Sequence, residues 1–346
     1  MNIRYRPPLK HIALVRIALG LLHTFDQHAI KTNFLTLNGD VSDKYYSKLV
    51  SKIKGLLPRQ GVPSCIQKEI SGIIRSLAWE IKRWLYSHDQ ILDENEIDLS
   101  DICWYSYGII DRFQTAQMLV RKESIHIKER FVLACKYYFG DHACTLWSNS
   151  SIFDQMVLAN DYGSDKSMWF WVDEFQTDFI LDSIQAHHDN STKTEKYNEN
   201  YLGLRCYFKT LGPQARYLCL SYGVTEREIH HFDLYLCFAE LTINEVKNLL
   251  GHIHASNRLK IMELFLSWPL QYIFVELLDQ LWSLISQYNL RNILKFILEE
   301  RIEKNWEDVD YAQLVQNILA HCPIPYKNRL KMDKIYAKVE LLFKKC

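Results

Sequence analysis

Histidine pairs are the first side chains in this sequence whose type and spacing could do chemistry, namely metal binding. His252 and His254 are separated by one residue, so on a β-strand both would point to the same side. They follow Gly251 at the expected end of a helix, and no cysteine or carboxylate lies at ligand spacing from them. Because zinc needs three or four protein ligands, we interpret the pair as cations near a helix C-terminus.

Two further histidine pairs have a carboxylate beside them. His187-His188-Asp189 opens a polar stretch that is typical of a solvated loop. His230-His231, followed by Asp233, lies near the expected start of a helix, where local hydrogen bonds satisfy such side chains. We predict no metal ligand at either position.

Acidic side chains form the next candidate site. Asp173-Glu174 with Asp178 and Asp182 places carboxylates at i, i+4 and i+8 along one helix face. Two opposing faces of this kind hold divalent ions in helical prenyl-converting enzymes, but the sequence contains no second acidic motif to oppose the first. We therefore interpret these residues as a solvated face.

The run Met168-Trp169-Phe170-Trp171-Val172 directly precedes these acids. Five successive large apolar residues cannot all face one side of a helix, so the helix is either buried all round or partly exposed. Exposed tryptophans would anchor a partner protein, because aromatic residues dominate binding energies at protein interfaces. The partner-binding residues predicted from this segment are Trp169, Trp171, Asp173 and Glu174.

Longer catalytic and cofactor motifs are missing from the sequence. It contains no Walker phosphate loop, no Gly-x-Gly-x-x-Gly, no His-Glu-x-x-His, no Gly-x-Ser-x-Gly and no EF-hand loop. Its 12 glycines are scattered singly, so no glycine-rich cradle for a phosphate is expected. We predict no catalytic residue, no bound cofactor and no metal site.

The composition favours helices as the elements that position these side chains. The chain has 346 residues, 48% of them hydrophobic, and its 41 basic residues balance 41 acidic ones. This excludes a largely disordered chain. Only 12 glycines and 8 prolines are present, fewer than folds with many tight turns require, so long helices with short connections are expected. The sequence contains no stretch of about 18 uncharged apolar residues, so we predict no membrane span.

The cysteines and the N-terminus bear on location in the cell. None of the nine cysteines forms a Cys-x-x-Cys pair, and several lie in apolar runs, which is typical of reduced, buried thiols. No acidic residue precedes Asp26, a property shared with mitochondrial presequences, but Pro7-Pro8 would break such a helix. We predict a cytoplasmic protein, with mitochondrial or nuclear locations as alternatives.

The clearest helical spacing lies late in the chain. Apolar residues recur every three or four positions from Ile273 to Ile285, and Ser267 and Pro269 suit the start of that helix. A turn is expected at 287–289, followed by a second helix with apolar residues from Leu290 to Ile302. Asp308 is expected to cap a third helix, which Pro323 and Pro325 stop, and apolar residues from Leu330 to Phe343 predict a last helix. The other predicted helices cover 9–25, 42–57, 64–87, 104–121, 126–139, 141–160, 165–186, 196–211, 213–222, 226–240 and 242–251.

These patterns predict an all-α fold of antiparallel helical hairpins, stacked as an irregular α-solenoid or a multi-helix bundle. A single helical-repeat domain over 1–346 is the preferred interpretation. A subdivision into 1–187 and 197–346 about the polar loop 188–196 is the alternative. Charge is segregated along the chain: residues 1–85 hold 14 bases and 5 acids, and the last 26 residues hold seven bases and two acids. Residues 151–200 hold ten acids and three bases.

Two segments echo each other, and with them the chain resembles ankyrin-like and other α-solenoid proteins. Arg130-Phe131-Val132-Leu133 is followed by Cys135, and His231-Phe232-Asp233-Leu234 by Cys237. The resemblance covers the hairpins only, because the Thr-Pro-Leu-His signature of ankyrin repeats is absent. Two further segments are similar to uncharacterised helical-repeat proteins of animals, a similarity that implies no activity: Glu307-Asp308-Val309-Asp310-Tyr311 and Phe139-Gly140-Asp141-His142.

The function expected from this fold is a non-enzymatic scaffold that binds a protein or peptide partner, because stacked hairpins leave an extended surface. An all-α enzyme whose site assembles from distant helices is the first alternative. A nucleic-acid-binding helical protein is the second, although the chain is neutral and has no recognised binding motif. The sequence leaves the oligomeric state open.

Overall fold

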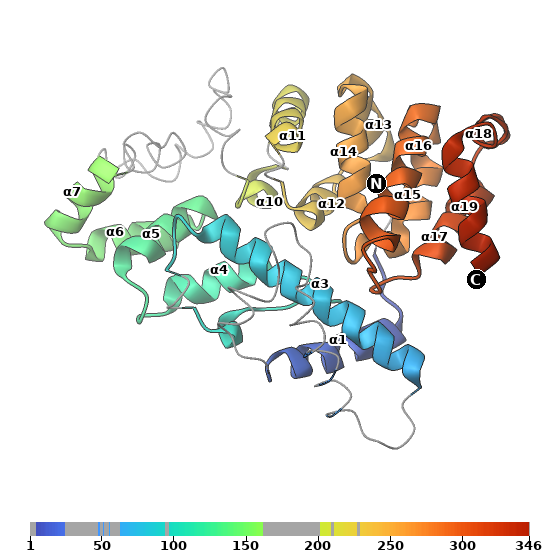
Figure 1. The fold of residues 1–346 in the computed structure, drawn as a ribbon. Helices are drawn as coiled ribbons and strands as arrows, with labels where there is room; N and C mark the ends of the chain where they lie inside the picture. Colours follow the sequence, from blue (N-terminus) through green and yellow to red (C-terminus); the bar gives the residue numbers. More distant parts are fainter. Residues whose placement is uncertain are drawn as a thin grey trace. The chain divides into compact units, whose positions relative to one another are not determined.

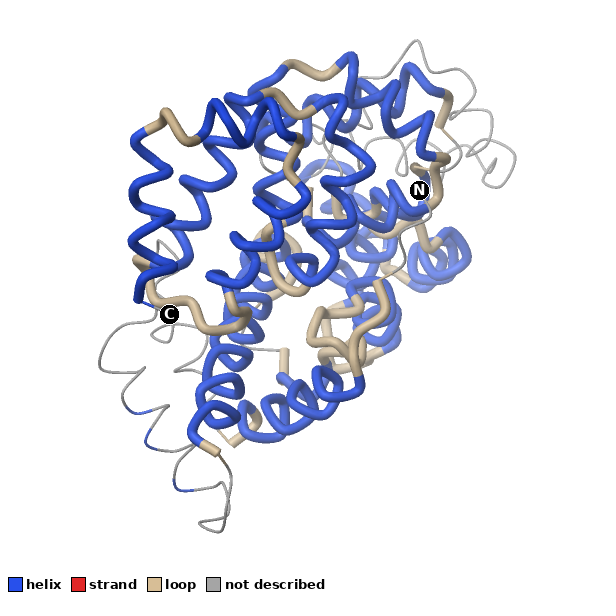
Figure 2. Tube along the Cα trace, turned by 90° about the vertical axis from the view of Figure 1, so that its right-hand side faces the viewer, coloured by secondary structure: helices blue, strands red, loops and turns tan. Residues whose placement is uncertain are grey.

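Helices and connecting loops make up the part of the chain that the computed structural model describes: residues 5–24, 48, 51, 55, 63–93, 97–161, 201–208, 211–226 and 229–345. No β-strand occurs within these ranges (Figure 2). The prediction of an all-α protein is therefore confirmed for the described residues.

The chain forms two compact units, which we describe separately. Unit 1 comprises Met1–Trp84, Trp104–Ile109 and Thr242–Cys346, and unit 2 comprises Leu85–Cys103 and Ile110–Leu241. The polar loop 188–196 lies outside the described residues, so a subdivision of the chain at that loop stays a prediction.

Unit 1 contains the N-terminal helices and the C-terminal series of helices (Figure 1). Short 3-10 turns, η5 (Leu270–Ile273) and η6 (Trp282–Leu284), and a π-helical segment, η7 (Ile297–Ile302), interrupt the series. Its α-helices are α1 (Leu9–Leu22), most of α3 (Ser64–His88), α13 (Ile243–His252), α14 (Ala255–Phe265), α15 (Phe274–Leu281), α16 (Gln287–Phe296), α17 (Tyr311–His321), α18 (Ile324–Leu330) and α19 (Lys334–Lys345).

Unit 2 contains the last turn of α3 and the helices in the middle of the chain. These are η2 (Leu99–Asp101), α4 (Arg112–Arg121), α5 (Ile127–Lys136), α6 (Gly140–Asn149), α7 (Ile152–Asp161), α10 (Leu204–Tyr207), α11 (Pro213–Glu226) and α12 (His231–Ala239). α5 packs against both α4 and α6, and α10 packs against α12. The core of the unit includes the fully buried rings of Phe131 and Tyr137, and His88 Nε2 lies 2.9 Å from the Tyr137 hydroxyl.

Several predicted helices need correction. The helix predicted over 104–121 starts only at Arg112, because residues before it form a tight loop in which the Tyr105 N–H donates to the Ile109 carbonyl at 2.8 Å. The helix predicted over 141–160 is two helices, α6 and α7. The chain is extended at Ser150 (ψ 145°), and the Ser151 hydroxyl accepts a hydrogen bond from the Asp154 N–H at 3.1 Å.

Hydroxyl and carboxylate caps fix where the C-terminal helices begin. Ser286 caps α16, so the residues 287–289 that were predicted as a turn form its first helical turn. Asp310, and not Asp308 as predicted, caps α17, with Oδ1 accepting from the Gln313 N–H at 2.9 Å. The regular part of the helix predicted from Ser267 starts later, at Phe274, after the 3-10 turn η5.

Alternate helices of the C-terminal series pack against each other (Figure 1). α14 contacts α16 and α16 contacts α18, while α15 contacts α17 and α17 contacts α19. Asn289 joins two of these helices, since its side-chain amide donates to the Ala255 carbonyl at the start of α14 (3.2 Å). The helices therefore form two adjoining rows, one of α14, α16 and α18 and the other of α15, α17 and α19.

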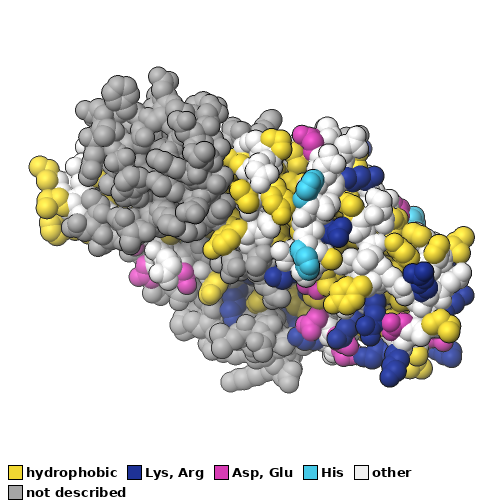
Figure 3. Space-filling view, turned by 90° about the horizontal axis from the view of Figure 1, so that it is seen from above, with side chains coloured by type: hydrophobic (Ala, Val, Ile, Leu, Met, Phe, Trp, Pro, Cys, Tyr) yellow, Lys and Arg dark blue, Asp and Glu magenta, His cyan; other side chains and the backbone are white. Residues whose placement is uncertain are grey.

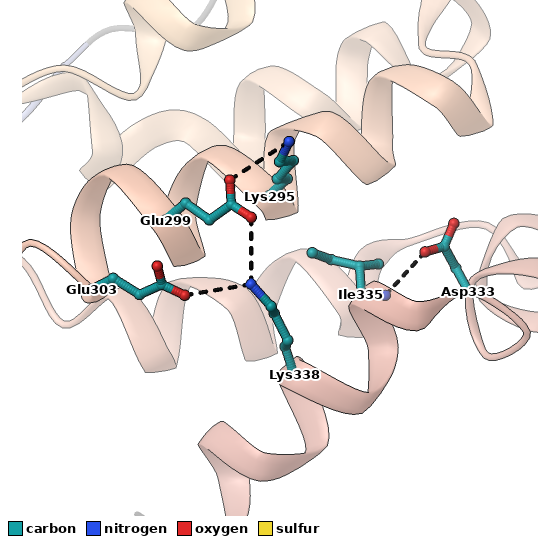
Figure 4. Close-up of polar contacts among 6 residues, drawn as sticks. All are labelled: Lys295, Glu299, Glu303, Asp333, Ile335 and Lys338. Carbon is teal, nitrogen blue, oxygen red and sulfur yellow. Dashed lines mark hydrogen bonds and ion pairs between the residues drawn. The ribbon is translucent and has the colours of Figure 1, made fainter.

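Ion pairs tie α19 to η7 and to Glu303, the residue that follows η7. Lys338 Nζ lies 3.4 Å from a carboxylate oxygen of Glu299 and 3.5 Å from one of Glu303, and Lys295 approaches Glu299 at 3.6 Å (Figure 4). Asp333 starts α19 by accepting from the Ile335 N–H at 3.0 Å. The paired side chains are exposed or half-exposed, so the pairs orient α19 while the buried Val339 contributes more of the stability.

Gly72 allows α3 to lie directly on the backbone of the segment that precedes α17. A Cβ atom at this position would lie 2.3 Å from the carbonyl carbon and oxygen of Glu307 and 2.6 Å from the Asp308 nitrogen. We expect Gly72→Ala to lower the free energy of unfolding by about 1–3 kcal/mol, because the backbone must shift. Gly20→Ala on α1 is the matched control, since its Cβ would meet no described atom within 4 Å and alanine favours helix. Equal midpoints in urea for both variants would contradict this contact.

The aromatic and acidic cluster predicted to bind a partner lies outside the described residues, as Trp169, Trp171, Asp173 and Glu174 all do. In the described ranges, no single helix is long and apolar enough to cross a membrane. The helices Ala255–Phe265 and Leu270–Leu284 are together long and apolar enough to cross a membrane, but the chain bends by 111° between them.

Candidate binding groove

A half-open groove of about 620 Å³ lies in unit 1 between α1, the first turns of α3 and the segment from the end of η7 to the start of α17. Its walls are mostly apolar and aromatic, and charged side chains stand among them. The apolar lining includes Pro8, Leu14, Ile73, Tyr272, Ile302, Trp306, Val309, Tyr311, Ala312 and Leu342. These residues come from segments hundreds of positions apart, so only the fold assembles the groove.

Two ion pairs carry most of the charge that lines the groove. Lys10 Nζ lies 2.8 Å from Glu69 Oε1, and Lys68 Nζ lies 3.2 Å from Glu307 Oε1. The first pair joins α1 to α3, and the second joins α3 to the segment before α17. Because lysines and glutamates occur here in equal number, these four side chains favour neither an anion nor a cation.

His11 is held among aromatic rings at one wall of the groove. Its ring lies 4.8 Å from the Trp268 ring and 4.9 Å from the Tyr272 ring, and its Nε2 is 3.4 Å from the Tyr107 carbonyl oxygen. Burial lowers the pKa of His11, and the Tyr107 carbonyl opposes that shift. The neutral ring therefore acts chiefly as part of the aromatic wall.

Arg75 of α3 holds the segment that forms the opposite wall. One guanidinium nitrogen donates to the carbonyls of Lys304 (3.1 Å) and Asn305 (3.0 Å), which follow the end of η7. The guanidinium also lies over the Trp306 ring, 4.1 Å from its centre, and Arg301 approaches the same ring at 4.9 Å. The two cation–π contacts fix the indole that lines the groove.

A buried carboxyl group lies in the same segment. Asp308 is 5% exposed, and its Oδ2 accepts from the Ser76 hydroxyl at 3.1 Å and from the Gln271 amide at 3.3 Å. The same amide donates to the Tyr311 hydroxyl at 3.1 Å. The other oxygen, Oδ1, has no hydrogen-bond partner among the described residues.

The environment of Asp308 favours its neutral form. Burial raises the pKa of this carboxyl, and the nearby Arg301 guanidinium and the hydrogen bonds only partly oppose the shift. The group thus joins α3, η5 and the segment before α17 through hydrogen bonds, with little charge to place in the interior.

The groove has more features of a binding site than of a reaction centre. The described lining residues include one thiol, Cys65, which is exposed and makes no hydrogen bond to a base. His11 is packed between rings, and Oδ2 of the buried Asp308 carboxyl already accepts hydrogen bonds from Ser76 and Gln271. An apolar floor with paired charges suits an extended chain or a helix that presents apolar side chains.

The histidine pairs singled out in the sequence are placed by local contacts. His252 Nδ1 lies 2.6 Å from the Asn248 carbonyl in the last turn of α13, and His254 caps α14 with Nδ1 accepting from the Ser256 N–H. His230 and His231 are buried at the start of α12, with ring centres 4.2 Å apart. The pair His187-His188 lies outside the described residues.

Sequence reasoning missed the groove and the role of Asp308. Ser76 and Gln271 lie 232 and 37 positions from Asp308, so no local pattern connects them. The one available signal was the acid-rich run at 307–310, in which Asp308 was interpreted as a helix cap and which was otherwise used only for the resemblance to helical-repeat proteins. A comparison with protein families, curated proteins and solved structures finds no match to this chain.

Proposed function

We propose that the chain is a non-enzymatic helical scaffold whose unit 1 groove binds a segment of a partner protein. The observation that supports this most is the lining of the groove, in which apolar and aromatic side chains alternate with the Lys10–Glu69 and Lys68–Glu307 pairs. The partner segment would place apolar side chains on the floor and would carry few net charges. Peptide-binding grooves commonly combine apolar pockets with a polar rim.

The arrangement of α14 to α19 supports the scaffold interpretation. Contacts between alternate helices are what a short, irregular α-solenoid would show, since each hairpin there leans on the next. We propose that this series holds η5 and the start of α17 in place, and so holds Tyr272 and Tyr311 at the groove.

Selection of displayed random peptides on the full chain tests this function. Selected peptides should share apolar residues, and Tyr272→Ala should weaken their binding by about tenfold or more, as the loss of an aromatic contact does. Tyr272 is 43% exposed, so the variant should fold.

The matched control is Tyr288→Ala, which removes an equally large side chain that is 60% exposed and does not line the groove. It should leave the affinity of the same peptides unchanged. Peptides that bind both variants equally well would show that the groove is not the binding site.

A small-molecule enzyme is the second candidate, because perturbed ionisable groups gather at the groove. Burial raises the pKa of Asp308, of Tyr272 and of Tyr311, and such clusters mark catalytic sites as well as structural ones. Turnover of any compound by the full chain that disappears in Asp308→Asn, with the fold unchanged, would favour the enzyme over the scaffold.

A further inference from the structure

The end of α18, the turn that follows it and the outer face of α19 carry cations that pair with no carboxylate of the described residues. Arg329, Lys331, Lys334 and Lys344 are exposed, and none lies within ion-pair distance of an acidic group in the described part of the chain. Of the two acids nearby, Asp333 pairs with Arg291 at 2.9 Å, which leaves Glu340. Positive charge therefore predominates on what we call the C-terminal basic surface.

Two large apolar side chains stand among these cations. Met332 in the turn is 89% exposed, and Leu341 on α19 is 57% exposed. Lys334, Leu341 and Lys344 are spaced at i, i+7 and i+10, so they lie along one face of α19, opposite the buried Ile335 and Val339. Figure 3 shows hydrophobic side chains directly beside Lys and Arg at the right-hand end of the molecule, where α18 lies in Figure 1.

From this pattern we propose that the C-terminal basic surface binds anionic lipid headgroups and inserts Met332 and Leu341 into the membrane interface. Peripheral membrane surfaces combine Lys and Arg with a few apolar side chains that enter the headgroup region. A protein interface needs a continuous apolar centre from which lysine is depleted, and here lysines separate the apolar side chains. The proposal does not depend on the groove. The groove is lined by other residues, and Leu342 is the one described residue of α19 among them.

Cosedimentation of the full chain with lipid vesicles tests this proposal. The chain should sediment with vesicles of phosphatidylcholine and phosphatidylserine, and not with phosphatidylcholine alone. Because each basic residue near an anionic bilayer contributes about fivefold in affinity, Lys331→Gln with Lys334→Gln should weaken binding by about 25-fold. Met332→Ser should weaken binding by about fivefold, because an inserted apolar side chain is lost.

Each variant has a control of the same chemistry elsewhere. Arg16→Gln with Arg121→Gln removes two exposed charges from α1 and α4, and Met156→Ser removes a methionine that is 61% exposed on α7. Both controls should bind the mixed vesicles as the unaltered chain does.

Three results would overturn the proposal. The first is equal sedimentation with both kinds of vesicle, or with neither. The second is an equal loss in Lys331→Gln/Lys334→Gln and in its control, which would show attraction by net charge alone. The third is full binding by Met332→Ser together with displacement by soluble polyglutamate, which would indicate an acidic protein as the ligand.

Discussion

Leu281→Asp is expected to unfold unit 1. The leucine is 1% exposed at the end of α15. A carboxylate there would lie unpaired in an apolar interior, which costs about 4 kcal/mol or more, a large part of the stability of an ordinary domain. Loss of the cooperative transition in thermal unfolding followed by circular dichroism would be the expected result.

The control for this variant is Leu341→Asp, the same substitution at a leucine that is 57% exposed on α19. Its free energy of unfolding should change by less than about 0.5 kcal/mol, as at most surface positions. Similar unfolding of the two variants, or an unchanged midpoint for Leu281→Asp, would show that the face assigned to the core of α15 is wrong.

The second large effect is expected at Asp308. Asp308→Ala should lower the free energy of unfolding by about 2–4 kcal/mol, because the buried donors of Ser76 and Gln271 lose their acceptor. Asp308→Asn keeps an acceptor oxygen and the shape of the side chain, so it should be much closer to the unaltered chain near neutral pH. Urea denaturation of the two variants measures this difference. If the Asp308 side chain only filled space, both variants would lower the free energy of unfolding by little.

The pH dependence of stability reports on the same group. Burial raises the pKa of Asp308 above its ordinary value of 3.8, so the protonated carboxyl is favoured in the folded chain. Its contribution to stability is therefore complete below pH 3.8 and is lost as the pH rises through the folded pKa.

Subtracting the stability of Asp308→Asn at each pH isolates this dependence from other titrating groups. The unaltered chain should lose stability relative to Asp308→Asn as the pH rises from about 4. A difference that is constant with pH would mean that folding leaves the pKa of this carboxyl unchanged, and one of opposite sign would mean that folding lowers it; either result would contradict the prediction.

The helices that the sequence predicted correctly are those whose signals are local. The apolar stripe with Leu277, Leu278 and Leu281 located α15, and its 3.6-residue spacing chose the buried face correctly. Helix starts were less certain because several residues in a row can act as a cap: Asp308 and Asp310 are equally suitable in sequence. Only the contact of Asp308 with Ser76 shows that the first of them turns inward.

The groove could not be predicted because its walls are brought together by tertiary contacts. Gly72 and Arg75 are unremarkable positions on α3 until the backbone of residues 304–308 lies against them. The exposure of single side chains could not be predicted either: nothing local to Met332 indicates that it is exposed while Leu330, two residues before it, is buried. Burial is decided by the neighbouring helices, and the stacking of those helices is a property of the whole unit.

Hydrogen exchange of the full chain with and without a selected peptide tests the central claim most directly. If the groove binds the peptide, amide protection should increase in the segment 302–312 and in the first turns of α3, the two walls that the groove unites. Exchange in α5 and α6 of unit 2 should stay as it is in the free chain. Protection confined to unit 2, with none at 302–312, would contradict the claim.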